Sequence, residues 1–433
     1  MQVSASYFGM GANRFWMPFV IQKMLIGDEL FTSMSISQWR IYMRSWKWLP
    51  VGLLAFSFVA CGVRSESETK AGPSPKVGIL LASHGDIDDA ATELKPYIEV
   101  SFKKNVGIPL PDWSREILTG PAYALSVATV KAQYDIIGPT KYKANSEIQR
   151  KAVEEELARV GVKGRVYLGY NFTPPFIYDA LAQMQKDGIE QIVVFNKGAQ
   201  FSYASSGENM EDALEYLHDH PEWNVEVTGY KYYTQDERFR AVLAKAISDD
   251  AQSLFRGVLP KDICILVASH GLPMWLVEKG DPAVQQMRDA FTDIKIRLLG
   301  YRLYHGFLND DFFPGAQWVS PKALAVADKL AEDGCKNVLM DGRLSFTTHH
   351  RATLYDLNYD VRNRLAELRG MPEKGGPKVV LAPNFDGNPS FANLMAQLSK
   401  EALSGKGRLV ILKKKDMPPL AKNVVGKPGN PVD

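Results

Sequence analysis

Short apolar runs that each end in polar residues recur along the chain. Each is four to eight residues long and rich in Val, Ile and Leu, which predicts a strand buried on both faces. The predicted strands lie within residues 76–84, 165–172, 189–197, 262–270, 335–346 and 377–385.

Segments with helical spacing of apolar residues lie between these strands. They are residues 145–162, 175–188, 281–299, 320–334 and 351–368. Asn145 or Ser146 is the expected cap of the first, and Asp281 caps the third, with Pro282 in its first turn. Strands that alternate with amphipathic helices indicate a parallel α/β sheet.

The two halves of the chain repeat one pattern. Each opens with a strand that ends in Ala-Ser-His, at His84 and His270, and each later shows a helix, an Asp-Gly stop and a strand. The sequence therefore predicts two similar doubly wound α/β domains, residues 76–258 and 259–412, with a cleft between them. Ligands of such sheets bind at the carboxyl ends of the strands, where both histidines are expected.

Composition narrows the function. The chain has 433 residues, 45% of them hydrophobic, and a net charge of +2 with scattered Lys and Arg, which argues against a nucleic-acid partner. The three cysteines show no CxxC spacing, so a thiolate zinc site or an iron–sulfur cluster is not expected, and Cys264 is interpreted as a buried packing residue. No phosphate-binding GxxxxGK or GxGxxG loop and no GxSxG elbow is found.

The first 75 residues are expected to direct the chain rather than to fold with it. Two basic residues, an apolar stretch over 49–60 and then Cys61 resemble a bacterial lipoprotein signal, with residues 62–75 as a polar tether. This predicts a membrane-anchored, extracytoplasmic protein lipidated at Cys61. A cytoplasmic protein is the alternative if the segment is not a working signal. Residues 413–433 are expected to be a disordered tail.

Two clusters could support chemistry. His270 can accept a proton near neutral pH or bind a metal, or it can simply end a strand. The second cluster holds His349, His350, Asp356 and Asp360, where the two carboxylates share one helical face. Imidazole with carboxylate suits iron(II), cobalt(II) or zinc, although acidic residues on a helix can also form a solvated face.

These residues stand in blocks that resemble the ferrochelatase family, the enzymes that insert iron(II) into a porphyrin. The resemblance covers about residues 77–400. Its blocks are ELKPYIEVSF (93–102), IIGPTKYKANSEIQ (136–149), PFIYDALAQMQKDGIEQIVVF (175–195), AQFSYASSGE (199–208), ASHGLPMWLVEKGDPAVQQ (268–286) and FTTHHRATLYDLNYD (346–360).

The resemblance implies a chelatase-like fold and roles for particular residues. His270 and His350 match the family's catalytic histidines, and together with Asp356 they would bind the metal. Asp356 and Asp360 match acidic positions on a polar path to the metal site. Further expected substrate-binding residues are His84, Gln200, Ser202 and Pro273.

The chain also departs from the family pattern. The family's glutamate two residues after the second histidine is Ala352 here, His349 replaces an aspartate, and Gly198-Ala199 replaces Tyr-Pro. Because alanine can neither bind a metal nor accept a proton, His84 is the favoured substitute.

The predicted function is a ferrochelatase-like lyase that uses a tetrapyrrole and iron(II), or cobalt or zinc, as substrates and has no prosthetic group. One alternative is an extracytoplasmic haem- or porphyrin-binding protein on an inactive chelatase fold. The other is a cobalt chelatase for a sirohydrochlorin-type ring.

Overall fold

The computed structural model describes residues 77–105, 107–108, 110–308, 316–405 and 409–413. All of them belong to one compact unit, Ser74–Asp433. The predicted signal, Cys61 and the tether lie outside the described residues, and of the predicted tail only Lys413 is described. In the described part of the chain, no helix is both long enough and apolar enough to cross a membrane.

The first sheet has the strand order β2-β1-β3-β4-β9. Its strands are β1 (Val77–Ser83), β2 (Gly164–Tyr170), β3 (Gln191–Asn196), β4 (Glu226–Tyr230) and β9 (Leu409–Lys413). The first four run parallel, while β9 pairs antiparallel with β4.

The second sheet has the order β6-β5-β7-β8, and all its strands are parallel. They are β5 (Ile263–His270), β6 (Arg302–Leu308), β7 (Asn337–Asp341) and β8 (Lys378–Leu381). In both sheets the first strand of the half lies between the second and the third, so the duplicated parallel α/β fold is confirmed.

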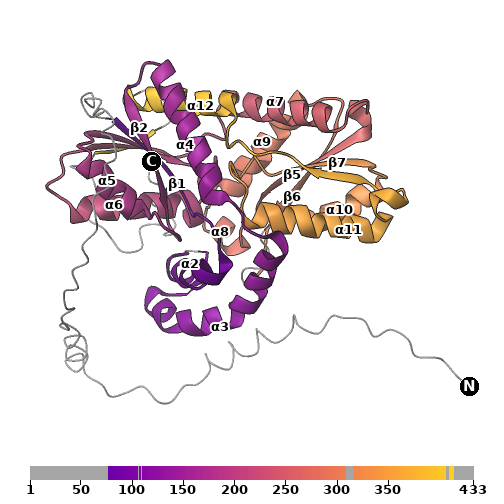
Figure 1. The fold of residues 1–433 in the computed structure, drawn as a ribbon, viewed down its shortest axis with the longest axis horizontal. Helices are drawn as coiled ribbons and strands as arrows, with labels where there is room; N and C mark the ends of the chain where they lie inside the picture. Colours follow the sequence, from indigo (N-terminus) through magenta and orange to yellow (C-terminus); the bar gives the residue numbers. More distant parts are fainter. Residues whose placement is uncertain (1–76, 106, 109, 309–315, 406–408, 414–433) are drawn as a thin grey trace, which may run out of the picture. The chain divides into compact units, whose positions relative to one another are not determined.

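One layer of helices covers a face of both sheets. Residues from its helices and from both sheets belong to one apolar core, which includes Ile79, Phe239, Ile265 and Phe391. Figure 1 shows several of these helices along the top of the sheets. The layer contains α4 (Tyr142–Arg159), α7 (Glu237–Leu254), α9 (Ala283–Arg297) and α12 (Pro389–Leu403).

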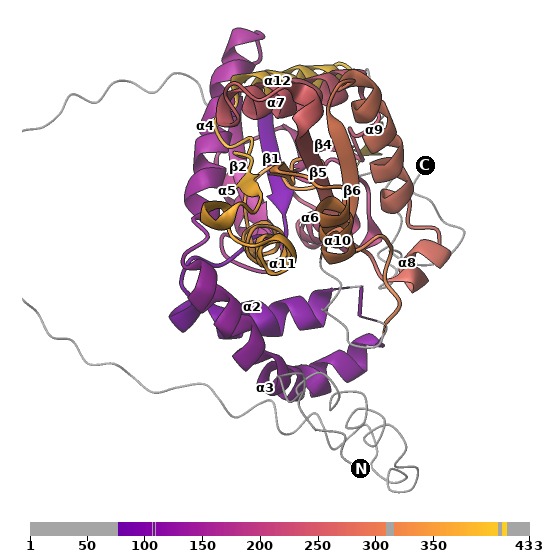
Figure 2. The same cartoon turned by 90° about the vertical axis from the view of Figure 1, so that its right-hand side faces the viewer.

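The opposite face of each sheet has its own pair of helices. On the first sheet they are α5 (Ile177–Lys186) and α6 (Glu208–Asp219), and on the second α10 (Ala323–Glu332) and α11 (Arg362–Arg369). In Figure 2, α10 and α11 lie below the strands and α7 and α12 above them. The short helices are η2 (Tyr203–Gly207), η3 (Pro260–Asp262), α8 (Met274–Glu278), η4 (Ala352–Val361) and η5 (Pro372–Lys374).

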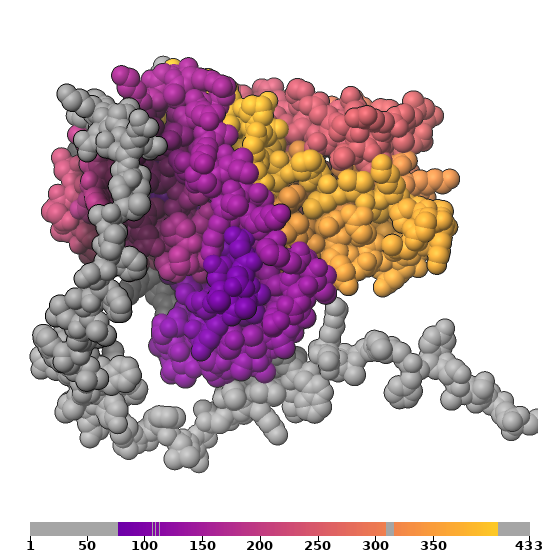
Figure 3. Space-filling model, viewed as in Figure 1, coloured from indigo at the N-terminus to yellow at the C-terminus, as the bar shows by residue number. Residues whose placement is uncertain are grey.

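Two helices that the sequence pattern does not predict lie between β1 and α4. They are α2 (Ala90–Lys104) and α3 (Asp112–Ile137), which contain Pro96 and Pro121 and pack on each other around Leu94. Proline is disfavoured inside a helix, so the sequence pattern does not predict either segment as a helix. In Figure 3 their indigo and purple surface adjoins the orange and yellow surface of the second half.

The predicted helix caps have mixed outcomes. The N-cap position of α9 is Pro282, but Asp281 just before it still caps the helix end, because its Oδ1 accepts a hydrogen bond from the backbone N–H of Ala283 at 3.0 Å. The cap at Asn145 or Ser146 is wrong, because α4 already begins at Tyr142. Ser146 is instead fully buried inside the helix and binds the side chain of Lys197.

The chain returns to the first sheet at its C-terminal end. Residues 389–413, which lie mostly in the predicted second domain (259–412), form α12 and β9. Helix α12 packs on α4, α7 and β3, and β9 extends the first sheet beside β4. The second sheet therefore comes from residues 263–381 alone, and the C-terminal segment ties the two halves together.

Cys264 and Cys335 form a disulfide. Both residues are buried, so the burial predicted for Cys264 is confirmed, but its interpretation as a mere packing residue is wrong. The bond joins the start of β5 to the turn before β7, which fastens the strand that leads to His270.

Candidate active site

Three histidines from distant parts of the chain come together at the ends of the first strands of the two sheets. His84 follows β1, His270 ends β5, and His350 lies in the segment after β7. The charges of His84 and His270 both lower the pKa of His350, which places the three imidazoles in one site. The structure thus brings together the three histidines that the sequence selected.

The geometry around His270 fixes which ring nitrogen carries the proton. Its Nδ1 lies 2.5 Å from the carbonyl oxygen of Gly271. A carbonyl oxygen only accepts hydrogen bonds, so Nδ1 holds the hydrogen and Nε2 keeps a lone pair. Burial lowers the pKa of His270 to about 4, helped by the charges of His84 and Arg351. The imidazole is therefore neutral at pH 7, with Nε2 able to take a proton or a metal.

The turn after His270 requires a glycine. A Cβ atom at Gly271 would lie 2.4 Å from the carbonyl oxygen of Leu308, closer than such atoms pack. The N–H of Gly271 donates to that same oxygen at 2.8 Å. The backbone N–H of His270 donates to Oγ of Ser345 at 3.2 Å, which holds the strand end against the segment that leads to His350.

Phe346 forms an aromatic wall between the two histidines of the second half. Its ring centroid lies 5.8 Å from that of His270 and 4.3 Å from that of His350. Burial, followed by the charges of His270 and Arg351, lowers the pKa of His350 well below its usual value. Both imidazoles of this half are thus held neutral beside an apolar surface.

His349 has a structural environment. Its Nε2 lies 3.2 Å from the carbonyl oxygen of Ala382, and its Nδ1 lies 3.2 Å from Oγ1 of Thr353. Both nitrogens face protein atoms, so this ring holds the strand end rather than facing a substrate.

The metal site predicted at His270, His350 and Asp356 stays a prediction. Among the described residues, no three His, Cys, Asp or Glu side chains are placed to share a metal ion. Asp356 lies on η4, with Oδ1 3.5 Å from Arg351, because that cation attracts the carboxylate. Asp360, one turn further on, is partly exposed.

Ala352 is the first residue of η4 and is only 2% exposed. At this sequence position the family pattern has a glutamate, whose carboxylate the alanine lacks. Arg351 beside it is anchored to the first half, because its backbone N–H donates to Oδ2 of Asp86 at 2.8 Å.

Two of the predicted substrate-binding residues, Gln200 and Ser202, lie in contacts between the halves. Gln200 donates from Nε2 to the carbonyl oxygen of Leu344 at 2.5 Å, and Ser202 donates from Oγ to Asp281 at 2.7 Å. Pro273 is buried just before α8. These contacts position the loop before α6 against the second half, and the binding of a substrate by these residues stays a prediction.

His84 stands against a carboxylate that sequence reasoning missed. Its Nε2 lies 3.3 Å from Oε2 of Glu208, and its ring stacks on Phe172 with centroids 4.5 Å apart. Glu208 is 4% exposed and opens α6. No motif links the two residues, which are brought together only by folding.

Lys197 was also missed, although its place directly after the apolar run of β3 was a signal. It is 4% exposed, and its Nζ donates to Oγ of Ser146 at 2.6 Å and to Oγ1 of Thr348 at 2.9 Å. Burial lowers its pKa to about 7, against the attraction of Asp386. Because Thr348 and Asp386 belong to the second half, this buried cation links the halves next to the histidines.

Asp86, two residues after His84, is buried as well. Its carboxylate accepts hydrogen bonds from Tyr134 and from the backbone N–H groups of Ile87 and Arg351. Burial raises its pKa to about 6. Asp86 therefore ties the turn after β1 to α3 and to the start of η4.

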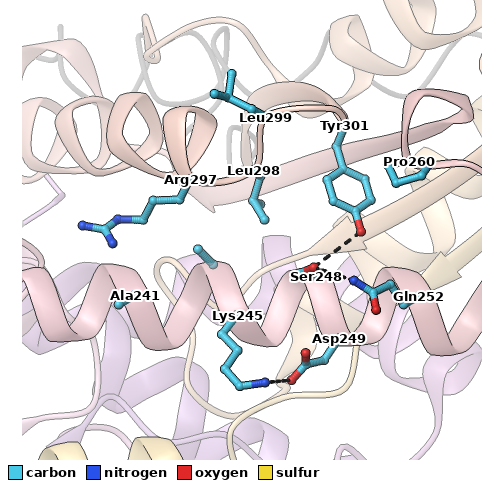
Figure 4. Close-up of a pocket in the computed structure, with 11 residues that line it drawn as sticks. Ala241, Lys245, Ser248, Asp249, Gln252, Pro260, Arg297, Leu298, Leu299 and Tyr301 are labelled. Carbon is cyan, nitrogen blue, oxygen red and sulfur yellow. Dashed lines mark hydrogen bonds and ion pairs between the residues drawn. The ribbon is translucent and has the colours of Figure 1, made fainter.

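A surface pocket of about 560 Å³ lies between α7 and the end of α9 (Figure 4). The figure shows its polar side chains paired with each other, Lys245 with Asp249 at 2.7 Å and Ser248 with Tyr301 at 3.5 Å. None of the three site histidines lines it.

Comparison with known proteins identifies the family. The model of the family described as Ferrochelatase matches residues 76–403. The chain belongs to the ferrochelatase family. The resemblance of the sequence blocks is thereby confirmed, and family membership supports an enzyme that is a tetrapyrrole metal chelatase.

Curated relatives span most of the chain. A ferrochelatase of Rippkaea orientalis is 24% identical over 331 residues, which cover 76% of this chain and 83% of that protein. The mitochondrial ferrochelatase of Bos taurus is 24% identical over 343 residues, covering 77% and 79%.

Among solved structures, the chain is similar to SirB from Bacillus subtilis with Fe3+, at 15% identity and a TM-score of 0.46 over 77% of this chain and 98% of that one. It is also similar to CbiX, the terminal enzyme of sirohaem biosynthesis in denitrifying bacteria, at 13% identity and a TM-score of 0.41, covering 76% and 99%.

Proposed function

We propose that this member of the ferrochelatase family inserts iron(II) into a porphyrin. The observation that carries the proposal is the state of His270, a neutral imidazole whose Nδ1 is engaged by Gly271 while its Nε2 keeps a lone pair. His270 is the last residue of β5 and stands beside Phe346, whose ring also contacts His350. An apolar wall and a neutral base are what a flat, weakly basic ring requires.

Metal insertion exchanges one divalent cation for two protons. Each pyrrole N–H must lose its proton as the metal forms bonds to the ring nitrogens, so the site must accept positive charge and release it. Nε2 of His270 accepts a proton from the ring, with His350 as the second acceptor. Because burial disfavours both imidazolium ions, each proton passes on to solvent rather than staying in the site.

Iron(II) and the porphyrin are both substrates in this scheme, and no step uses a prosthetic group. Cobalt(II) and zinc are alternative metals, since all three accept imidazole and carboxylate ligands. The test is the metallation of a panel of rings, namely protoporphyrin, coproporphyrin and sirohydrochlorin, with each metal under anaerobic conditions.

One observation favours a second function. Ala352 leaves the second half without the carboxylate of the family pattern, as expected for a haem- or porphyrin-binding protein that no longer inserts metal. In the same panel, ring binding without metallation in any combination would support this second function. Selective metallation of sirohydrochlorin with cobalt(II) would instead identify a cobalt chelatase.

We also propose that the protein is anchored outside the cytoplasm through a lipid on Cys61. The buried disulfide of Cys264 and Cys335 supports this location, because such bonds persist in oxidising compartments.

Palmitate labelling in a bacterial host tests the anchor. Label is expected in the wild-type protein, where Cys61 follows the apolar stretch of the signal, and should be absent from Cys61→Ser. The Cys335→Ser variant is the control and should remain labelled. Equal labelling of wild type and Cys61→Ser would contradict the anchor.

A further inference from the structure

Three neighbouring strand ends of the first sheet each meet the first turns of α6. The contacts are His84 Nε2 to Glu208 Oε2 at 3.3 Å, Asn171 Nδ2 to Asp212 Oδ2 at 2.7 Å, and Asn209 Nδ2 to Asn196 Oδ1 at 2.7 Å. We call His84, Asn171, Asn196, Glu208 and Asn209 the strand-end cluster. It comes from β1, β2, β3 and α6, and from no other part of the described chain.

The register of the sheet explains why these side chains converge. Ser83 pairs with Tyr170, so the residues that follow them, His84 and Asn171, lie side by side, and Asn196 pairs with Ala82. Side chains two residues apart on a strand point to the same face. All three strand-end side chains therefore point to the face that α6 covers.

The cluster contains buried polar atoms without hydrogen-bond partners. Nε2 of His84 and the Oδ1 atoms of Asn171 and Asn209 are buried and have none among the described residues. Asn171 is 0% exposed and Asn209 2%. Burying an amide oxygen without a partner is unfavourable, so such atoms indicate a ligand or ordered water. The unpartnered atoms are mainly acceptors, which favours a cation.

The charge of the surroundings also favours a cation. The carboxylate of Asp212 is balanced by Lys104, whose Nζ lies 2.8 Å away. The Glu208 carboxylate is 4% exposed and lies 3.3 Å from Nε2 of His84. Imidazole, carboxylate and amide oxygen together are a donor set that suits iron(II), cobalt(II) and zinc.

We propose that the strand-end cluster is a transit site for the divalent metal substrate. His84 and Glu208 are its two strong ligands, and the amide oxygens of Asn171 and Asn209 complete it. The remaining buried donor, Nδ2 of Asn196, binds a water molecule carried by the metal. A site with only two strong ligands binds a metal with moderate affinity. The metal can therefore leave the site for the ring.

This inference rests on the proposed function and gives the halves different tasks. The first half delivers the metal from His84 and Glu208, and the second half takes the pyrrole protons at His270 and His350. Glu208 of the first half then supplies a carboxylate. The second half lacks one because Ala352 stands where the family pattern has a glutamate. The charge of His84 acts on both His270 and His350, so the delivery site lies within electrostatic range of the proton acceptors.

Cobalt(II) binding to the full chain without any ring tests the site. The absorption of bound cobalt and calorimetry should show at least about a tenfold weaker affinity in His84→Ala and Glu208→Gln. Glu215→Gln, at an exposed position of α6, is the matched control and should bind like wild type. If Glu208→Gln does not fold, Glu208→Asp tests the same ligand and should bind with intermediate affinity.

Turnover separates the inference from the proposed function. If wild type metallates a ring, Glu208→Gln should raise the KM for the metal several-fold while kcat changes less.

Wild-type cobalt affinity in both His84→Ala and Glu208→Gln would overturn the transit site, whatever the turnover. Loss of cobalt binding in His270→Ala alone would move the metal site to the second half. A wild type that binds cobalt through His84 and Glu208 but metallates no ring would refute the proposed function and leave the cation site standing.

Discussion

His270→Ala is expected to lower kcat for metal insertion by roughly 10²–10⁴-fold, the range seen when a general base is removed. Because Nδ1 of His270 donates a hydrogen bond to Gly271, the proton from the ring is accepted by Nε2. Alanine has no group that could accept this proton. Anaerobic metallation followed by absorbance gives kcat and KM for both substrates. KM for the ring should change little, because Phe346 still provides the apolar wall.

The pH profile distinguishes this role from ordinary histidine catalysis. Burial lowers the pKa of His270 to about 4, so the neutral, proton-accepting form persists as pH falls through the usual value of 6.5. The kcat of wild type should therefore stay level down to about pH 6, where an exposed histidine would lose half or more of its neutral form. The exposed His218→Ala variant is the control and should match wild type. A kcat of His270→Ala within threefold of wild type would contradict the assignment.

Lys197→Met is expected to destabilise the protein by roughly 1.5–3 kcal/mol, because it removes two buried hydrogen bonds made by a charged donor. Lys197 donates to Ser146 and Thr348. Burial raises the pKa of the half-buried Asp386, and the charge of Lys197 opposes that rise. Methionine keeps the length of the side chain but none of these interactions. Denaturant unfolding of wild type and variant measures the difference in the free energy of unfolding.

Two further variants make this test specific. Lys197→Met with Asp386→Asn should recover part of the loss, because the uncompensated carboxylate is gone. Lys186→Met, at an exposed position of α5, should change stability by less than about 0.5 kcal/mol. A loss below about 1 kcal/mol in Lys197→Met would mean that the buried cation does not hold the halves together.

Much of the fold could be predicted because apolar residues recur along the chain with clear strand spacing or clear helix spacing. The runs that end at His84 and His270 are apolar without interruption, and the helix and Asp-Gly stop before β3 and β7 repeat the same pattern. Helices α2 and α3 were missed because Pro96 and Pro121 interrupt their pattern. Strand β9 was missed because its partner β4 lies far away in the sequence.

The site could be predicted only in part, and for a physical reason. Histidines at the ends of apolar runs mark the carboxyl edges of parallel strands, so His84 and His270 could be selected from sequence. His350 was selected because it matches a histidine in one of the family's sequence blocks. The residues that complete the site, Glu208 and Lys197, could not be selected from sequence. Their positions depend on how α6 and the second half pack against the first sheet. The bond between Cys264 and Cys335 likewise spans 71 residues and follows no motif.

The most direct test of the central claim is a single-turnover metallation of protoporphyrin by the wild-type chain with anaerobic iron(II). The absorbance bands of the ring report the reaction. The account predicts conversion of the free porphyrin spectrum to that of the metallated ring at a rate that depends on protein concentration and is lost in His270→Ala. Tight ring binding with no conversion, for this ring and for coproporphyrin and sirohydrochlorin with iron, cobalt or zinc, would contradict it.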